Sequence, residues 1–93
     1  MAKVNDKTIE LIKDEASLLA DPLGLKVVKV EYLKEDGLWY LRVTISAPSP
    51  ITTDDCAKLH RPLSKRLDEL DPIPGSYYLE VTSSGSEEIV TPQ

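Results

Sequence analysis

The sequence predicts an α+β domain built as a two-layer sandwich, with two helices on one face of a three-stranded sheet. Three observations lead to this expectation. Two segments repeat apolar residues at spacings of three and four, as an amphipathic helix does. Three other segments are rich in strand-forming residues and alternate apolar with polar side chains. The 93 residues suffice for a single hydrophobic core.

A first helix is expected over residues 6–20. Asn5 or Asp6 can cap its first turn, and Pro22 and Gly24 follow as residues that end a helix. The apolar residues that should share its buried face are Ile9, Ile12, Ala16 and Leu19.

A β-hairpin is expected next, with strands over residues 25–33 and 38–47. The turn between them contains Gly37, which tolerates the backbone angles of a tight turn. Because side chains alternate between the two faces of a strand, the residues of this hairpin divide into one set for each face of the sheet. The set expected to face the helices is Val28, Val30, Tyr32, Trp39, Leu41, Val43 and Ile45.

A second helix is expected after Thr52, with Asp55 in the capping-box position. Pro62 falls inside it and should bend the helix without dividing it. A third strand follows over residues 77–83, which completes the element order α-β-β-α-β. We expect residues 1–83 to form the domain and residues 84–93 to form a polar, flexible tail. The apolar stripe of the second helix is Cys56, Leu59, Leu63, Leu67 and Leu70.

Charge and composition narrow the classes of function. The formal net charge of −5 favours a basic partner over a nucleic acid at long range. A single cysteine allows no intrachain disulfide, and no apolar run reaches the ~20 residues of a membrane span. These features predict a cytoplasmic protein.

The candidate catalytic residues each have a simpler structural interpretation. Asp54 and Asp55 are placed to cap a helix, and Cys56 begins an apolar stripe. His60 lies four residues after Cys56, but off the face that Cys56 shares with the leucines. One cysteine and one histidine provide no zinc-site spacing. We therefore predict no enzyme activity, no metal and no cofactor.

Two surfaces are candidate binding sites. The sheet face away from the helices should carry Val27, Leu33, Tyr40 and Tyr78 among charged residues, which suits either an interface or an ordinary solvated face with ion pairs such as Glu31–Arg42. The second helix carries a basic stripe, Lys58, Arg61 and Lys65, which suits either phosphate contacts or a solvated face. The candidate partner-binding residues are Glu31, Tyr40, Arg42, Asp68, Glu69, Tyr78 and Glu80.

The order of these segments resembles the N-terminal domain of the ribosome maturation factor RimP family. The matching stretches are residues 22–25, 28–32, 38–43, 51–56, 67–68 and 71–83, of which Ile51-Thr52-Thr53-Asp54-Asp55-Cys56 and Asp71-Pro72-Ile73-Pro74-Gly75 are the most telling. The resemblance implies a fold distantly like a type II KH domain, a role in maturing the small ribosomal subunit, contact with one of its basic proteins, and no catalytic residues.

The chain departs from the family pattern after the third strand. The family continues there through a Ser-Pro-Gly-Leu-Asp-Arg-Pro-Leu segment into a second, Sm-like domain, and here residues 83–90 keep only Ser83 and Gly85 of that segment. We expect either an excised domain or a stand-alone relative. Three functions remain in view, namely a protein-binding assembly factor for the small subunit, an RNA-binding module, and a regulatory protein-binding domain unrelated to the ribosome.

Overall fold

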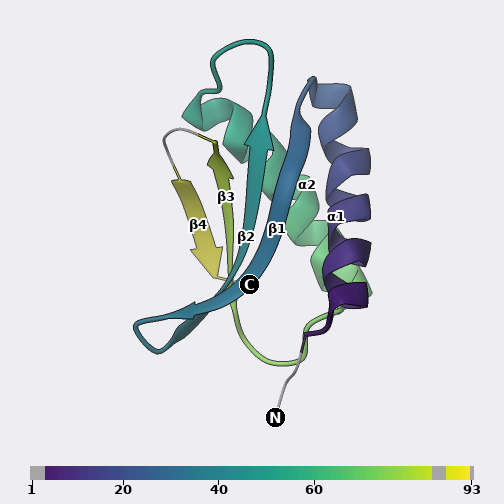
Figure 1. The fold of residues 1–93 in the computed structure, drawn as a ribbon, viewed down its shortest axis with the longest axis vertical. Coiled ribbons are helices and arrows are strands. Elements are labelled where there is room, and N and C mark those ends of the chain that lie inside the picture. Colours follow the sequence, from purple (N-terminus) through teal and green to yellow (C-terminus); the bar gives the residue numbers. More distant parts are fainter. Residues whose placement is uncertain (1–3, 85–87, 93) are drawn as a thin grey trace.

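The computed structural model describes residues 4–84 and 88–92 of the chain. Two helices and a mixed sheet make two layers (Figure 1). The buried residues of both helices and the inward residues of the strands belong to one core, so both helices cover the same face of the sheet. The elements are α1 (Asp6–Ala20), a short 3-10 helix η1 (Asp21–Leu23), β1 (Lys26–Glu35), β2 (Leu38–Ser46), α2 (Thr53–Leu70), β3 (Tyr78–Ser83) and β4 (Glu88–Pro92).

Helix α1 has the bounds that its sequence pattern predicts. Asn5 caps it, and its side-chain oxygen accepts a hydrogen bond of 2.9 Å from the amide of Thr8. The 3-10 turn η1 then leads into Gly24, whose φ of 73° is the left-handed conformation that glycine adopts without strain.

The β1–β2 hairpin contains a bulge that the alternation pattern did not predict. Asp36 and Gly37 both have positive φ, as a two-residue hairpin turn requires. Val27 pairs with Ile45 and Lys29 pairs with Thr44, so Val28 is an extra residue in β1. The bulge reverses the faces predicted for Val27 and Val28. Val27 is 6% exposed and lies in the core, whereas Val28 is 49% exposed.

Helix α2 runs without interruption through Pro62. Its first turn contains the predicted capping box, in which Thr52 and Asp55 exchange hydrogen bonds of 3.2 Å and 3.0 Å. His60 is buried with the apolar stripe, although we expected it off that face. The stripe residues that are fully buried are Cys56, Leu59, Leu63 and Leu67, whereas Leu70 is half-buried.

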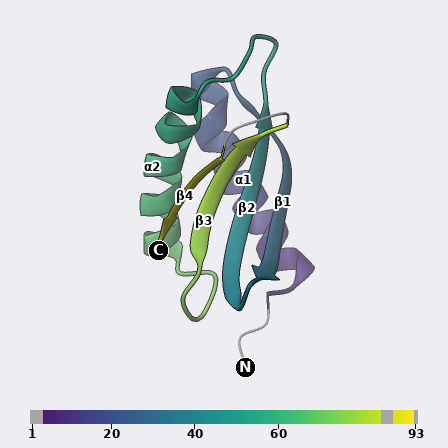
Figure 2. The ribbon, with the colours of Figure 1, turned by 90° about the vertical axis from the view of Figure 1, so that its left-hand side faces the viewer.

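The strand order is β1-β2-β3-β4. Strands β2 and β3 pair in parallel, with α2 as the crossover between them, and the two outer pairs are antiparallel (Figure 2). Strand β4 lies within residues 84–93, where we expected a flexible tail, and it makes the sheet one strand wider than predicted. Among the described residues, no helix is both long and apolar enough to cross a membrane.

Candidate interaction surface on the open sheet face

An aromatic pair lies on the sheet face opposite the helices. Tyr40 of β2 and Tyr78 of β3 are partners in the parallel register, and their ring centroids are 5.5 Å apart with planes 29° from parallel. Both side chains are half-buried, and half-buried Leu33 of β1 lies opposite Tyr40. Offset stacking of this kind stabilises neighbouring strands and leaves ring surface available to a partner.

A charged pair lies next to these rings. Arg42 and Glu80 follow the two tyrosines on the same strands and are also register partners. The Nε of Arg42 donates to the carboxylate of Glu80. Glu80 is only 1% exposed, although we expected an acid on the surface that could attract a partner. Its carboxylate instead holds the Arg42 guanidinium in place, which is how proteins accommodate a buried charge.

Arg42 also links the sheet face to the outer end of the hairpin. Its Nη2 lies 3.3 Å from the carboxylate of Glu35, a residue that the sequence analysis did not identify as a candidate. Glu31 lies opposite Arg42 in the register, but its ion pair, 3.4 Å long, is with Lys29. The guanidinium therefore connects a buried acid with an exposed one.

The other two predicted acids lie elsewhere. Asp68 and Glu69 are exposed on the last turn of α2, which packs on the opposite side of the sheet from Tyr40 and Arg42. Glu69 forms an ion pair of 3.5 Å with Arg66, which also donates from Nε to Glu15 of α1 at 2.8 Å. The seven predicted residues thus divide between the open sheet face and the end of α2.

The basic stripe of α2 is exposed to solvent. Lys58 forms an ion pair of 3.2 Å with Asp54, one turn earlier. Arg61 and Lys65 are also exposed, and neither forms an ion pair with a described residue. The stripe therefore contains two cations available for an external anion.

The residues weighed for catalysis have structural roles. Asp55 belongs to the capping box, Asp54 pairs with Lys58, and Cys56 is 1% exposed within the core. The Nε2 of His60 lies 3.0 Å from the carbonyl oxygen of Leu79, so the imidazole joins α2 to β3. Sequence periodicity could not reveal this bond, because it depends on how α2 lies over the strand.

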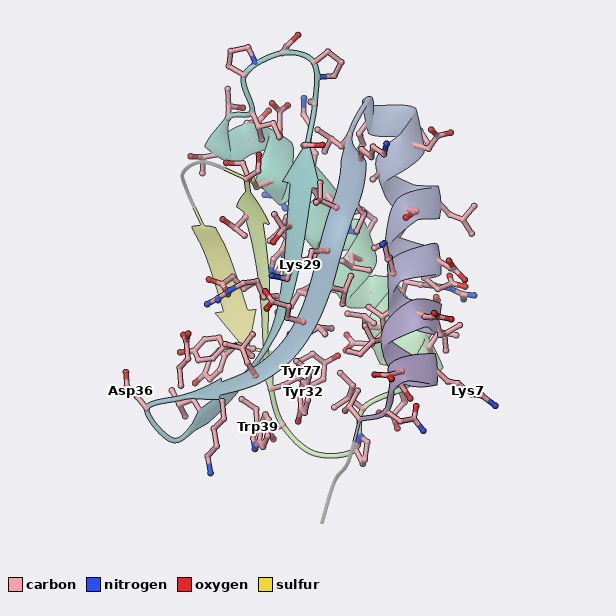
Figure 3. All side chains as sticks on the ribbon, in the orientation of Figure 1. Lys7, Lys29, Tyr32, Asp36, Trp39 and Tyr77 are labelled. Carbon is pink, nitrogen blue, oxygen red and sulfur yellow. The ribbon has the colours of Figure 1, made fainter. Side chains whose placement is uncertain are left out.

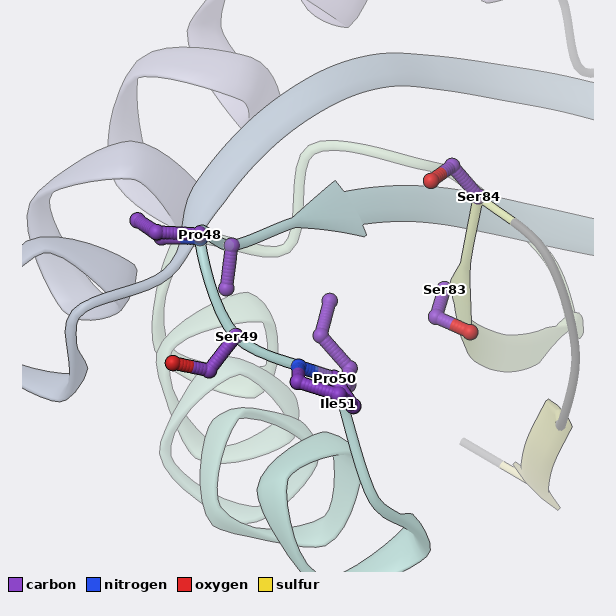
Figure 4. Close-up of a pocket in the computed structure, with 7 residues that line it drawn as sticks. Pro48, Ser49, Pro50, Ile51, Ser83 and Ser84 are labelled. Atoms are coloured by element: carbon purple, nitrogen blue, oxygen red, sulfur yellow. The ribbon is translucent and has the colours of Figure 1, made fainter.

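A pocket of about 420 Å³ lies where β2 and β3 end (Figure 4). Ser49, Ser83 and Ser84 are among its lining residues, and none of the lining residues is charged. The nearby amides of Thr52 and Asp55 are already used by the capping box. The pocket therefore offers no charged side chain to a ligand. Its lining consists of residues 47–51, Ser83 and Ser84.

Two helices cover one face of a mixed sheet, and the other face is open and carries aromatic and charged side chains. This arrangement defines a two-layer α+β domain with a candidate interaction surface on its open sheet face. The family model of the RimP N-terminal domain matches residues 16–87, which is most of the chain. The chain therefore belongs to the RimP N-terminal domain family, as the resemblance in sequence predicted. This is a family of ribosome maturation factors and not a family of enzymes.

Proposed function

We propose that this chain is a non-catalytic binding domain that acts in the cytoplasm in maturation of the small ribosomal subunit, by contacting one of the subunit's basic proteins. The observation that carries the proposal is the family match over residues 16–87. The net charge of −5 supports a basic partner, because opposite charge accelerates association and like charge opposes it.

The open sheet face suits such a contact. Aromatic side chains and arginine are enriched at protein interfaces, and here the Tyr40–Tyr78 stack lies next to Arg42. Because Glu80 is buried, its role in the proposal is to position Arg42 rather than to attract the partner. The acids that steer association are then Glu31 on the sheet and the α2 pair, Asp68 and Glu69.

RNA binding through α2 is the second candidate. The observation in its favour is that Arg61 and Lys65 are exposed and form no ion pair with a described residue. Cations of this kind contact phosphates, and each lost contact lowers affinity and the salt dependence of binding. The two candidates therefore predict opposite effects of charge reversal.

Two sets of variants separate the candidates, each reversing three charges. Replacing Glu31, Asp68 and Glu69 by lysine should slow association with isolated small subunits if the partner is a basic protein. The effect should shrink as salt rises, since screening acts beyond ~8–10 Å. Replacing Lys58, Arg61 and Lys65 by glutamate should then have little effect or accelerate association.

The measurement is the association rate at two salt concentrations, with the circular dichroism of each variant as a control for folding. The six side chains are exposed or half-buried, so their replacement should leave the fold intact. Loss of binding in the variant without the basic stripe, with binding retained in the variant without the acids, would overturn the protein-binding proposal in favour of RNA.

A further inference from the structure

A second aromatic pair lies at the outer end of the β1–β2 hairpin, on the sheet face that carries the core. Tyr32 and Trp39 stack with ring centroids 4.6 Å apart and planes 6° from parallel. Trp39 is 38% exposed, so part of its ring surface faces solvent. The Nζ of Lys34 lies 5.9 Å from the centre of the Trp39 ring, which places a cation next to this indole within the same chain.

Acidic residues lie at the same end of the molecule as this stack, since α2 ends in the lower part of Figure 1, where the β1–β2 turn also lies. Burial, followed by the charges of Asp68 and Asp71, raises the pKa of Tyr77 to about 12, and Tyr32 contributes as well. Asp71 begins the loop that leads from the end of α2 to Tyr77, and Figure 3 shows Tyr32, Tyr77 and Trp39 grouped at one end of the molecule.

The end of α2 is a region of concentrated negative charge. The last turn of the helix contains no basic residue, and the C-terminus of the helix adds the negative end of the helix dipole. Neither Asp68 nor Asp71 forms an ion pair with any residue in the described part of the chain. An exposed aromatic ring and unpaired carboxylates at one end of the molecule are together complementary to a basic segment that contains a planar cationic side chain.

We propose that the Tyr32–Trp39 stack and the carboxylates of Asp68 and Asp71 form a docking site for an arginine-containing basic segment of a protein partner. An arginine of that segment lies over Trp39, where it displaces Lys34, and its neighbours pair with the two aspartates. The inference deepens the proposed function, on which it rests for the presence of a basic partner. An RNA ligand is disfavoured, because the same carboxylates repel phosphate.

Trp39 is the only tryptophan in the chain, so its fluorescence reports on this site alone. We would titrate the full chain with an oligoarginine peptide, using an oligoglutamate peptide of the same length as the control. The expected result is a saturable change in emission with oligoarginine and none with oligoglutamate. A linear, unsaturable response to oligoarginine would overturn the proposal.

Matched charge variants test the assignment of the acids. Asp68→Asn with Asp71→Asn should weaken oligoarginine binding roughly fivefold to tenfold, as expected for two exposed ion pairs. Asparagine suits position 71, where φ is 47° and a left-handed backbone must be kept. The control is Asp14→Asn with Asp21→Asn, which removes the same charge from exposed positions on α1 and η1. Equal weakening by both pairs would show attraction by net charge alone and overturn the proposal.

Two further variants test the aromatic contact, with binding measured by calorimetry. Trp39→Leu should weaken oligoarginine binding, whereas Lys34→Ala should bind at least as tightly as the wild type because the competing cation is gone. Weaker binding by Lys34→Ala would contradict the displacement.

Association with small subunits separates the two proposals. If the wild type binds small subunits, and both Trp39→Leu and the Asp68/Asp71 double variant bind them equally tightly, this inference is overturned and the proposed function is left intact. Absence of wild-type binding to subunits would instead overturn the proposed function, and the peptide titration would still decide whether the docking site exists.

Discussion

The Nε of Arg42 donates to a Glu80 carboxylate that is almost entirely enclosed on the sheet face away from the helices. The Glu80 side chain is 2% exposed and that of Arg42 is 24% exposed, so the acid is the more deeply buried partner. A buried carboxylate is costly unless a cation and hydrogen bonds compensate it. The pair therefore contributes to folding as well as to the shape of the candidate surface.

Arg42→Met should lower the free energy of unfolding by about 3 kcal/mol, because it removes the guanidinium that compensates a buried charge. Urea denaturation measures the loss. Replacing both residues by methionine should recover most of it, since the charge itself is then absent. Glu31→Gln is the control, as its pair with Lys29 is exposed. A stability change in Arg42→Met no larger than that in the control would contradict the prediction.

Leu63→Ala should lower the free energy of unfolding by ~2–5 kcal/mol, the range for large-to-small changes in a core. Leu63 is fully buried on α2, in one cluster with residues of α1 and the sheet. Leu18→Ala provides the matched control, because Leu18 is exposed on α1 and should change stability by less than ~0.5 kcal/mol. Equal melting midpoints for the two variants would count against the assigned core.

Thr52→Ala should destabilise the protein by ~1 kcal/mol, because the amide of Asp55 loses its side-chain acceptor at the start of α2. Thr52→Ser keeps a hydroxyl at the same position and should retain most of the stability. The comparison is made by thermal denaturation of both variants. A serine variant as unstable as the alanine variant would show that the methyl group, rather than the cap, is responsible.

Tyr77 should ionise at a higher pH than an ordinary tyrosine when the folded chain is titrated by ultraviolet absorbance. Its pKa is raised from 10.0 to about 12, so the unfolded chain releases this proton at lower pH than the folded chain does. The unfolded state then binds fewer protons between pH 10 and 12, and stability must fall as the pH rises through that window. Tyr77→Phe should flatten this decline, and an unchanged decline in that variant would contradict the prediction.

Much of the fold could be predicted because the signals are local. Helix α1 begins at a capping asparagine and ends before a proline, and α2 begins at a capping box. These features depend on neighbours within four residues, so a single sequence reveals them. The hairpin turn at Asp36 and Gly37 is local in the same way.

The bulge in β1 could not be predicted, because a bulge is defined by the partner strand. Val27 and Val28 are chemically alike, and only the pairing with Ile45 and Thr44 decides which of them points into the core. A strict alternation therefore assigned both to the wrong faces. Strand β4 was missed for a related reason, since a short strand with a polar start has little signal of its own.

The candidate site was predicted in part. Tyr40, Arg42 and Tyr78 share the open face as expected, since strand alternation places them there. The burial of Glu80 was not predicted, because it depends on the position of β3 between two other strands of the sheet. The stack of Tyr32 on Trp39 requires a diagonal approach across two strands, which no pattern within one strand reveals.

The parallel pairing of β2 with β3 has a consequence for the order of folding. The hairpin joins β1 to β2 through a two-residue turn, but Arg42 and Glu80 meet across 38 residues of chain. Closing the longer loop costs more chain entropy and needs α2 to bridge the strands. We expect the hairpin to form early and the arrival of β3 to limit the folding rate, so that the surface made by Tyr40, Arg42 and Tyr78 is assembled in the slowest step.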